Sequence, residues 1–203
     1  MNPEEQFWGW FLSHERELFQ FDPCGEDARE KLFDDMAGEL HKVHRALAFE
    51  FGPPETKREF VISAAGIRSA FPAVARLAAA APSLERWQIV AFRPRRSPVM
   101  SIEINGKLIS PTDVQFTLLD NGKMAGLHLF IPGYQEEDLD FKQIGYLLLD
   151  ETLGEYDVEM RLGLIKMLPP DARTDGDRHS LPELPVLFDR LVSRLEGRSG
   201  AAS

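Results

Sequence analysis

The sequence predicts an α+β fold with a mostly antiparallel sheet, an N-terminal helical hairpin and a C-terminal helix. Apolar residues recur at helical spacing within residues 1–46 and again within 180–196. Residues 47–167 instead hold short runs of β-branched and aromatic residues, separated by turn signals and interrupted by two helical segments. Two Asn-Gly pairs, Asn105-Gly106 and Asn121-Gly122, are typical of tight hairpins, because both residue types tolerate positive φ.

The N-terminal region predicts two helices joined by a turn. Asn2, Pro3 and the two glutamates that follow form a typical helix start. Asp22-Pro23 interrupts the helix. Six apolar residues then fall on one face of a second, longer helix: Leu32, Phe33, Met36, Leu40, Val43 and Leu47. Trp10 points away from the apolar residues of the first helix, so either that helix lies between two layers or Trp10 contributes to a partner surface.

Residues 47–93 predict a hairpin, a helix and a strand. Strand-like runs at 47–51 and 58–64 flank a turn, and an alanine-rich helix spans 71–82. The next run, 87–93, is apolar on both faces, which predicts a central strand covered on each side. Four further strands are predicted at 100–104, 107–110, 113–120 and 123–131, with both Asn-Gly pairs as two-residue turns.

The C-terminal part predicts a helix, a strand and a last helix. The first helix spans 137–153 and ends at Gly154, a natural C-cap. Apolar and charged residues then alternate from Tyr156 to Leu164, which predicts a half-buried strand. A capping box of Ser180 and Glu183 begins the last helix. Ten residues are predicted to be buried together: Val61, Leu77, Ile89, Ala91, Phe116, Leu129, Leu148, Val158, Met160 and Leu187.

An architectural repeat is one interpretation of this order of elements. Residues 47–93 and 113–167 both predict hairpin, helix and strand, which corresponds to two ββαβ units pairing into one larger sheet. The alternative is coincidence, because α+β chains often reuse short patterns. A chain of this length is most often one large domain, so we expect a single domain over 1–196 and a disordered tail over 197–203.

Charge and composition limit the function classes. The chain has 33 acidic and 23 basic side chains, which gives a formal net charge of −10. Such a surface repels phosphate backbones and favours a basic protein partner, so no nucleic-acid binding is expected. No stretch reaches the apolar length of a membrane span, and the N-terminus lacks the features of a signal peptide. We therefore expect no membrane association and a cytoplasmic location.

Cysteine and histidine usage predicts neither a cofactor nor a metal site. Cys24 is the only cysteine, so no intramolecular disulfide is possible, which fits a reducing compartment. It lies among acidic residues, which disfavour the reactive thiolate, and is interpreted as a loop cysteine. His41 and His44 are three residues apart on a predicted helix, but two ligands fall short of a zinc site. No catalytic residue is predicted.

Two segments are candidates for a ligand or partner site. In the loop after strand 58–64, Ser63 and Arg68 precede a helix whose N–H groups can bind an anion, or the small residues there only allow close helix packing. The turn after helix 137–153 can hold a cation or supply an acid/base pair, or it is a solvated turn. Its candidate residues are Asp150, Glu151, Glu155 and Tyr156.

The only basic cluster of the chain is a third candidate. It contains Arg93 and Arg95 and follows the predicted strand 87–93. Guanidinium groups recognise phosphates and carboxylates in a bidentate manner, so the cluster is a candidate for binding an anion. The alternative is a solvated loop that balances nearby acids.

Several segments together resemble a group of bacterial hypothetical proteins. They are FWGWF at 7–11, VISAAG at 61–66 and LLLDETLGEYD at 147–157. The group has no established activity, so the resemblance implies no catalytic residues. LDETLGEYD at 149–157 is also similar to Leu-Asp…Leu-Gly-Glu segments of some small bacterial immunity proteins, which neutralise toxins.

Two functions follow from these observations. The first is an acidic cytosolic protein-binding or regulatory module, favoured because no complete catalytic constellation occurs. The alternative is a small-molecule-binding protein or hydrolase-like enzyme that uses the 63–68 loop and the 150–157 turn. We also predict that these two segments lie on the same edge of the sheet, with an arginine paired to a glutamate from the set Arg68, Arg95, Glu151 and Glu155.

Overall fold

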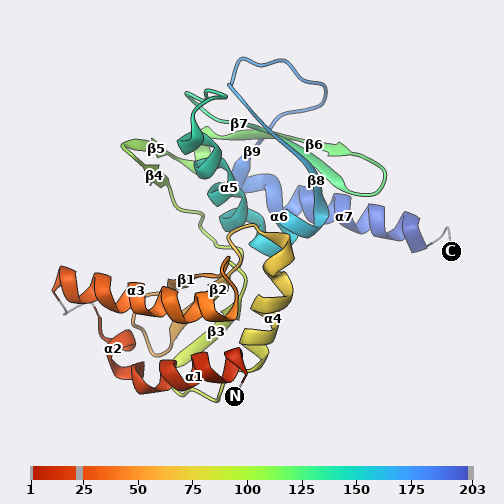
Figure 1. Ribbon diagram of the computed structural model, residues 1–203. Coiled ribbons are helices and arrows are strands. Elements are labelled where there is room, and N and C mark those ends of the chain that lie inside the picture. Colours follow the sequence, from red (N-terminus) through yellow and green to blue (C-terminus); the bar gives the residue numbers. More distant parts are fainter. Residues whose placement is uncertain (1, 22–24, 201–203) are drawn as a thin grey trace. The chain divides into compact units, whose positions relative to one another are not determined.

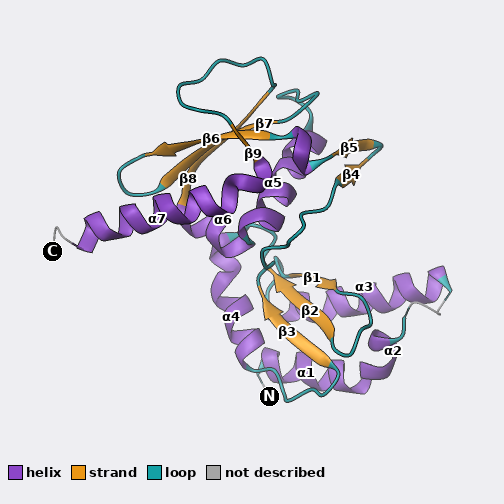
Figure 2. Cartoon of the chain, turned by 180° about the vertical axis from the view of Figure 1, so that it is seen from behind, coloured by secondary structure: helices purple, strands orange, loops and turns teal. Residues whose placement is uncertain are grey.

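The computed structural model describes residues 2–21 and 25–200 (Figure 1 and Figure 2). The chain divides into two compact units, residues 1–93 and 94–203, and each is described by itself. The prediction for Cys24, and that for the last three residues of the expected tail, lie outside the described residues. A single domain over 1–196 stays a prediction.

The first unit contains three strands and the N-terminal helices. Its elements are α1 (Pro3–Ser13), α2 (Glu15–Phe19), α3 (Glu26–Val43), β1 (Ala48–Phe51), β2 (Arg58–Ser63), the 3-10 helix η1 (Arg68–Ala70), α4 (Phe71–Ala79) and β3 (Trp87–Ala91). β1 pairs antiparallel with β2, and β3 pairs parallel with β2 on its other side (Figure 2). The predicted N-terminal helices and the ββαβ order of this region are confirmed.

Aromatic side chains form the centre of the first unit's core. Phe60 on β2 is fully buried, and its ring stacks on those of Phe7 and Phe11 from α1, with centroid distances of 6.1 and 5.3 Å. The buried indole of Trp8 donates a hydrogen bond of 2.9 Å to the Leu77 carbonyl. Because a buried indole N–H needs a partner, this bond fixes α1 against α4.

β3 is an edge strand, so the prediction of a central strand at 87–93 is wrong. The order β1-β2-β3 places β2 in the middle, and β2 carries the fully buried run of Phe60, Val61 and Ile62. β3 instead exposes Ala91, and Ile89 is only partly buried. An apolar pattern on both faces does not distinguish the two positions, because burial depends on which strand lies between two others.

The second unit contains a hairpin, a four-stranded sheet and three helices. Its elements are β4 (Ile102–Ile104), β5 (Lys107–Ile109), η2 (Pro111–Asp113), β6 (Gln115–Asp120), β7 (Ala125–Phe130), α5 (Leu139–Leu153), α6 (Glu155–Arg161), β8 (Leu162–Leu168), β9 (His179–Ser180), η3 (Leu181–Glu183) and α7 (Leu184–Gly200). The sheet order is β8-β7-β6-β9, and β4 and β5 pair only with each other. The core between this sheet and helices α5 and α7 is apolar.

Strands β6, β7 and β8 repeat the order seen in the first unit. β6 and β7 form an antiparallel hairpin, and β8 lies parallel to β7 after the helical segment. This confirms the α+β class and the ββαβ interpretation. The pairing of both units into one larger sheet is wrong, because the described strands form separate sheets of three, two and four strands.

The two Asn-Gly pairs form different turns. Asn105 and Gly106 have φ values of 49° and 78° and join β4 to β5 directly, as predicted. The second pair does not form a two-residue turn, because Asp120 pairs with Ala125 and four residues connect β6 to β7. The Asp120 carboxylate accepts a hydrogen bond of 3.0 Å from the Gly122 N–H, a local contact that favours this longer connection.

Residues 155–161 form helix α6, so the first half of the predicted strand from Tyr156 is wrong. β8 begins only at Leu162. The buried residues Glu155, Val158 and Leu162 are three and four positions apart, which is the spacing of one helix face. The same segment also alternates between apolar and charged residues, which is why a strand was predicted. Gly154, with a φ of 82°, turns the chain between α5 and α6.

The last helix begins as predicted and ends later than predicted. Ser180 and Glu183 form the reciprocal capping box within η3. Helix α7 then continues to Gly200, so the predicted disordered tail is wrong for 197–200. Arg198 donates a hydrogen bond of 2.9 Å to the Asp120 carboxylate, a contact with the sheet that the apolar pattern of the helix does not reveal.

The ten predicted core residues divide between two cores. Six of them are buried: Val61, Leu77, Phe116, Leu129, Leu148 and Val158. Ile89 and Leu187 are partly buried, and Ala91 and Met160 are exposed. The burial predicted for Met160 depended on a strand alternation that helix α6 replaces.

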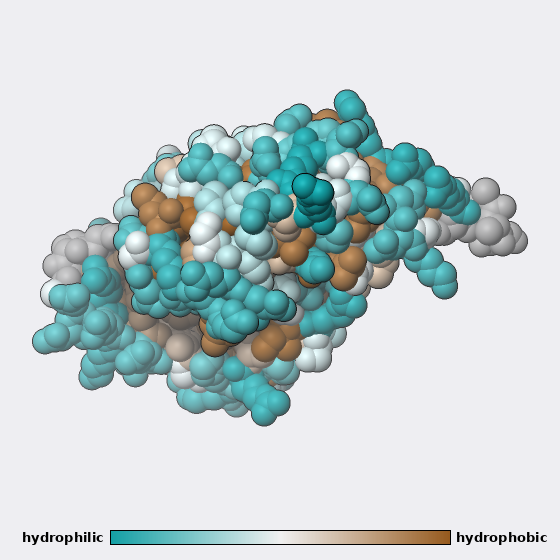
Figure 3. All heavy atoms as spheres, turned by 90° about the horizontal axis from the view of Figure 1, so that it is seen from above, coloured by the Kyte–Doolittle hydropathy of each residue, from teal (hydrophilic) through white to brown (hydrophobic). Residues whose placement is uncertain are grey.

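Exposed apolar side chains are scattered over the described surface. On the face seen in Figure 3, hydrophobic residues form separate small areas among hydrophilic ones. Trp10 is half-buried and its ring stacks on the His14 ring at 4.3 Å. None of the helices in the described ranges combines the length and the apolar character needed to span a membrane.

Thr117 and His128 lie opposite each other on β6 and β7, beneath the loop that follows β8. A Cβ atom added at Gly176 of that loop would lie only 2.8 Å from Cγ2 of Thr117, so the loop passes close to this side chain. Lys166 on β8 is the register partner of His128. Within the described residues, Thr117 Oγ1 and His128 Nδ1 are buried without a hydrogen-bond partner. Burial lowers the pKa of His128, and the positive charge of Lys166 lowers it further.

The stability of the protein should therefore depend on His128 in a defined pH window. Its pKa in the folded state lies below the ordinary value of 6.5, so the unfolded chain binds more protons there. The contribution of His128 is complete above pH 6.5 and is lost as the pH falls through the folded pKa. Urea unfolding of the wild type and of His128→Asn at about pH 5 and about pH 7.5 measures this. The variant should lose less stability on acidification, and equal losses would contradict the assignment.

Candidate functional site

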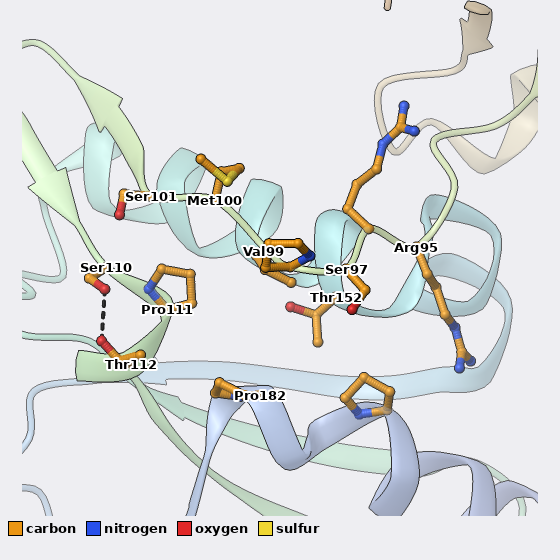
Figure 4. Close-up of a pocket in the computed structure, with 13 residues that line it drawn as sticks. Arg95, Ser97, Val99, Met100, Ser101, Ser110, Pro111, Thr112, Thr152 and Pro182 are labelled. Atoms are coloured by element: carbon orange, nitrogen blue, oxygen red, sulfur yellow. Dashed lines mark hydrogen bonds between the residues drawn. The ribbon is translucent and has the colours of Figure 1, made fainter.

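The second unit contains a pocket of about 630 Å³ beside the segment that connects β3 to β4. We call residues 95–101 of this segment the strap. Figure 4 shows the strap running in an extended course along one side of the pocket, with η2 at one end and Pro182 opposite. The lining residues are Arg95, Arg96, Ser97, Pro98, Val99, Met100, Ser101, Ser110, Pro111, Thr112, Thr152, Pro182 and Pro185.

Arg95 anchors the beginning of the strap. Its guanidinium group donates two hydrogen bonds of 2.9 and 2.8 Å to the Asp189 carboxylate of α7 and one of 2.7 Å to Asp157 of α6. Its Nε donates to the Leu153 carbonyl at 2.8 Å, at the end of α5. One planar side chain thus connects three helices, which suits arginine because its donors form a fixed fork.

The ion pair between Arg95 and Asp189 favours the charged form of both side chains. Hydrogen bonding to Asp189 raises the pKa of Arg95, against the effect of burial. The hydrogen bond from Arg95 in turn lowers the pKa of Asp189. Asp157 also contacts Arg161 at 3.4 Å. The charge of Arg95 is therefore compensated within the unit, and its role in the site is to hold the strap in place.

Within the described residues, few backbone groups of the strap make hydrogen bonds. The Arg96 N–H donates a hydrogen bond of 2.7 Å to the Glu151 carbonyl. Beyond it, the backbone groups of Ser97, Val99 and Met100 make no hydrogen bond within the described ranges. The Ser97–Pro98 peptide bond is cis. The Met100 side chain is 66% exposed, so this stretch presents both an apolar side chain and open backbone groups.

The opposite wall of the pocket is made of hydroxyl groups and proline rings. The Ser110 and Thr112 hydroxyls are 2.8 Å apart and hydrogen-bonded to each other. Thr152 is buried, and its hydroxyl donates a hydrogen bond of 2.6 Å to the Leu148 carbonyl. The proline rings come from η2, η3 and the start of α7. Among the described lining residues, only Arg95 and Arg96 carry an ionised side chain.

The sequence-predicted residues of the first unit lie at three places. Ser63 is fully buried at the end of β2, and its Oγ accepts a hydrogen bond of 2.9 Å from the Ala65 N–H. Arg68 is exposed in η1. Arg93 follows β3 and forms an ion pair with Glu50 on β1. Ser63 thus contributes to the local turn, in which Ala65 has a positive φ of 48°.

The acidic turn lies in the second unit, between α5 and α6. Asp150 and Glu155 are buried, Glu151 is partly buried, and Tyr156 is 48% exposed. The structure brings this turn next to the strap through the Glu151 carbonyl. The prediction that it shares a site with Ser63 stays a prediction, because the two segments belong to different units.

Sequence reasoning selected Arg95 but not its partners. Its acidic contacts are Asp157, which lies at the end of the predicted acidic turn, and Asp189, which is 94 positions away. The distance along the chain leaves no signal in the sequence for the second contact. The serine, threonine and proline residues that line the pocket do not form a recognisable sequence motif, so sequence reasoning did not select them.

Within the described part of the chain, no three or more His, Cys, Asp or Glu side chains are grouped as a metal site requires. Comparisons with protein-family models, with curated proteins and with solved structures found no match.

Proposed function

We propose that this chain is a protein-binding module that holds an extended peptide segment of a partner protein along the strap. The observation that carries the proposal is the open backbone of Ser97, Val99 and Met100 beside a pocket of about 630 Å³. Extended peptides bind to such edges by main-chain hydrogen bonds, while pockets select alternate side chains. The strap provides the first feature, and the pocket provides the second.

The composition of the pocket supports an apolar side chain as its occupant. Proline rings, Val99 and Met100 supply apolar surface, and the Ser101 hydroxyl can bond to a peptide group near the rim. The anchoring of Arg95 to α6 and α7 holds the strap in place before binding. A preformed edge lowers the entropy cost of binding an extended peptide.

The charge of the chain supports a basic partner. The formal net charge is −10, and the charge of Arg95 is compensated by Asp157 and Asp189. Long-range attraction between opposite charges raises the rate of association with a basic protein. The expected ligand is therefore an extended segment with apolar side chains and flanking lysine or arginine residues.

A small-molecule-binding function of the same pocket is the second candidate. Its volume of about 630 Å³ lies within the range of ordinary ligand sites. The hydrolase-like alternative, which uses the 63–68 loop and the 150–157 turn, stays a proposal without a supporting contact. The described hydroxyl groups of the pocket that are engaged bond to each other or to a carbonyl, which favours binding over nucleophilic chemistry.

A peptide selection tests the proposed function. A random peptide library is selected against the purified full chain, and the enriched peptides are measured against Ser101→Trp and Ser193→Trp. Ser101 lines the pocket, whereas Ser193 is an exposed residue of α7 outside it, so the two variants add the same side chain at different places. We expect extended, basic and apolar peptides whose binding Ser101→Trp weakens at least tenfold, while Ser193→Trp leaves it unchanged. Equal binding to both variants would contradict the proposal.

A further inference from the structure

A second pocket of the same unit has a different chemistry. It has a volume of about 510 Å³ and lies where α7 packs on β6, with His179 of β9 in its lining. Its lining residues are Leu118, Asp120, Asp177, His179, Leu187, Arg190, Leu191 and Arg194. Three leucines make an apolar floor, and the remaining side chains are charged or polar.

Arginines follow one stripe of α7 along this pocket. Arg190, Arg194 and Arg198 are spaced by four residues, so their side chains emerge on the same face of the helix. Residues with this spacing are about 5–6 Å apart at Cβ, so two adjacent guanidinium groups can contact one small anion. The stripe is a local concentration of positive charge on a chain whose net charge is −10.

Asp120 compensates one end of the stripe. Its carboxylate accepts hydrogen bonds from Arg198 at 2.9 Å and from the Gly122 N–H at 3.0 Å, and it lies 3.4 Å from Arg194. The hydrogen bond from the Gly122 N–H is the largest cause that lowers the pKa of Asp120, and the hydrogen bond from Arg198 lowers it further. Arg198 is therefore the main partner of Asp120, and Arg194 keeps donors for another acceptor.

The other end of the stripe is uncompensated. Within the described residues, Arg190 makes no hydrogen bond and no ion pair, although it lines the pocket. Asp177 also lines the pocket and likewise has no partner there. His179 packs its ring on Phe116 at a centroid distance of 5.6 Å, and its Nδ1 lies 3.9 Å from Glu183. The pocket thus presents uncommitted donors and one uncommitted carboxylate.

We propose that this pocket binds a small phosphate monoester that also carries a hydroxyl group. Arg190 and Arg194 hold the phosphate, because guanidinium donors match its oxygens in a bidentate manner. Asp177 accepts a hydrogen bond from the ligand hydroxyl, and the leucine floor supports its carbon skeleton. This pocket shares no lining residue with the proposed peptide site.

Calorimetric titration at low ionic strength tests the proposal with two probes, inorganic phosphate and glycerol 3-phosphate. The full chain should bind glycerol 3-phosphate more tightly than inorganic phosphate, because only the former has a hydroxyl group for Asp177. Arg190→Gln should weaken binding of glycerol 3-phosphate at least fivefold. The control Arg45→Gln removes an equal charge from an exposed position of the first unit and should leave binding unchanged.

Asp177→Asn separates the role of the carboxylate from that of the arginines. Inorganic phosphate should bind this variant more tightly, because the repulsion between two negative groups is removed. The preference for glycerol 3-phosphate should decrease. No binding of either probe at about 10 mM would overturn the proposal. A loss below fivefold in Arg190→Gln, or an equal loss in Arg45→Gln, would do so as well. Arg190 is exposed, so its variant should fold, and circular dichroism checks this.

Discussion

Replacing Leu148 by alanine should lower the free energy of unfolding by about 2–5 kcal/mol. Leu148 on α5 is fully buried in the apolar core of the second unit. Truncation removes apolar contacts and leaves a cavity that surrounding side chains fill only in part. All three tryptophans, Trp8, Trp10 and Trp87, lie in the first unit. Urea unfolding should therefore be followed by circular dichroism or amide exchange rather than by fluorescence alone.

Leu139→Ala is the matched control for this prediction. It makes the same change in the same helix, but Leu139 is 73% exposed. Its effect should stay within about 0.5 kcal/mol, as is usual for surface substitutions. A loss below about 1 kcal/mol for Leu148→Ala would show that α5 packs differently from this description.

Replacing Arg95 by glutamine should cost about 1–3 kcal/mol. Hydrogen bonds to charged groups are stronger than neutral ones, and Arg95 makes such bonds to both Asp157 and Asp189. The side chain is 32% exposed and that of Asp189 is 54% exposed, so solvent screening keeps the effect below that of a buried pair. Arg95→Lys should recover only part of the loss, because an ammonium group cannot form the same fork.

A double-mutant cycle with Asp189→Asn tests the cause of the Arg95 effect. In the wild type, Asp189→Asn removes a bidentate contact. In the Arg95→Gln background this contact is already absent, so the second substitution should cost about 1 kcal/mol less. Additive effects, measured by urea unfolding, would mean that the two side chains do not interact in solution.

Much of the fold could be predicted because its local signals agree with the tertiary structure. Asn105-Gly106, the Gly154 cap and the Ser180 capping box each have one conformation that their residue types favour, and each occurs as expected. The order hairpin, helix and strand also follows from local periodicity. The two ββαβ units could therefore be predicted without any knowledge of long-range contacts.

The errors occur where local signals are ambiguous. β3 has the apolar pattern of a central strand, but strand order is a property of the whole sheet. In 155–161 the alternation of apolar residues coexists with a helical spacing of buried residues, and strong helix formers decide the outcome. The second Asn-Gly pair lies in a longer loop because Asp120 bonds to Gly122.

The candidate site could be predicted only in part, for a similar reason. Arg95 lies in the only basic cluster, which made it a candidate, and its partner Asp157 lies at the end of the acidic turn. The strap's open backbone and the hydroxyl and proline walls have no residue-type signature. The sequence analysis did not select Arg190, Arg194 and Arg198, because residues four positions apart do not form a cluster along the chain. Only the structure shows which of these arginines has no acidic partner within the described residues.

Amide hydrogen exchange of the strap, with and without a selected peptide, tests the central claim most directly. The N–H groups of Ser97, Val99 and Met100 make no hydrogen bond within the described residues, so they should exchange fast in the free protein. At saturating peptide, at least one of them should become protected, because strand addition pairs alternate backbone groups. The Arg96 N–H donates a hydrogen bond to the Glu151 carbonyl in the free protein, so its exchange rate is the internal reference for the other three amides. Peptide binding that leaves all three strap amides in fast exchange would contradict the account.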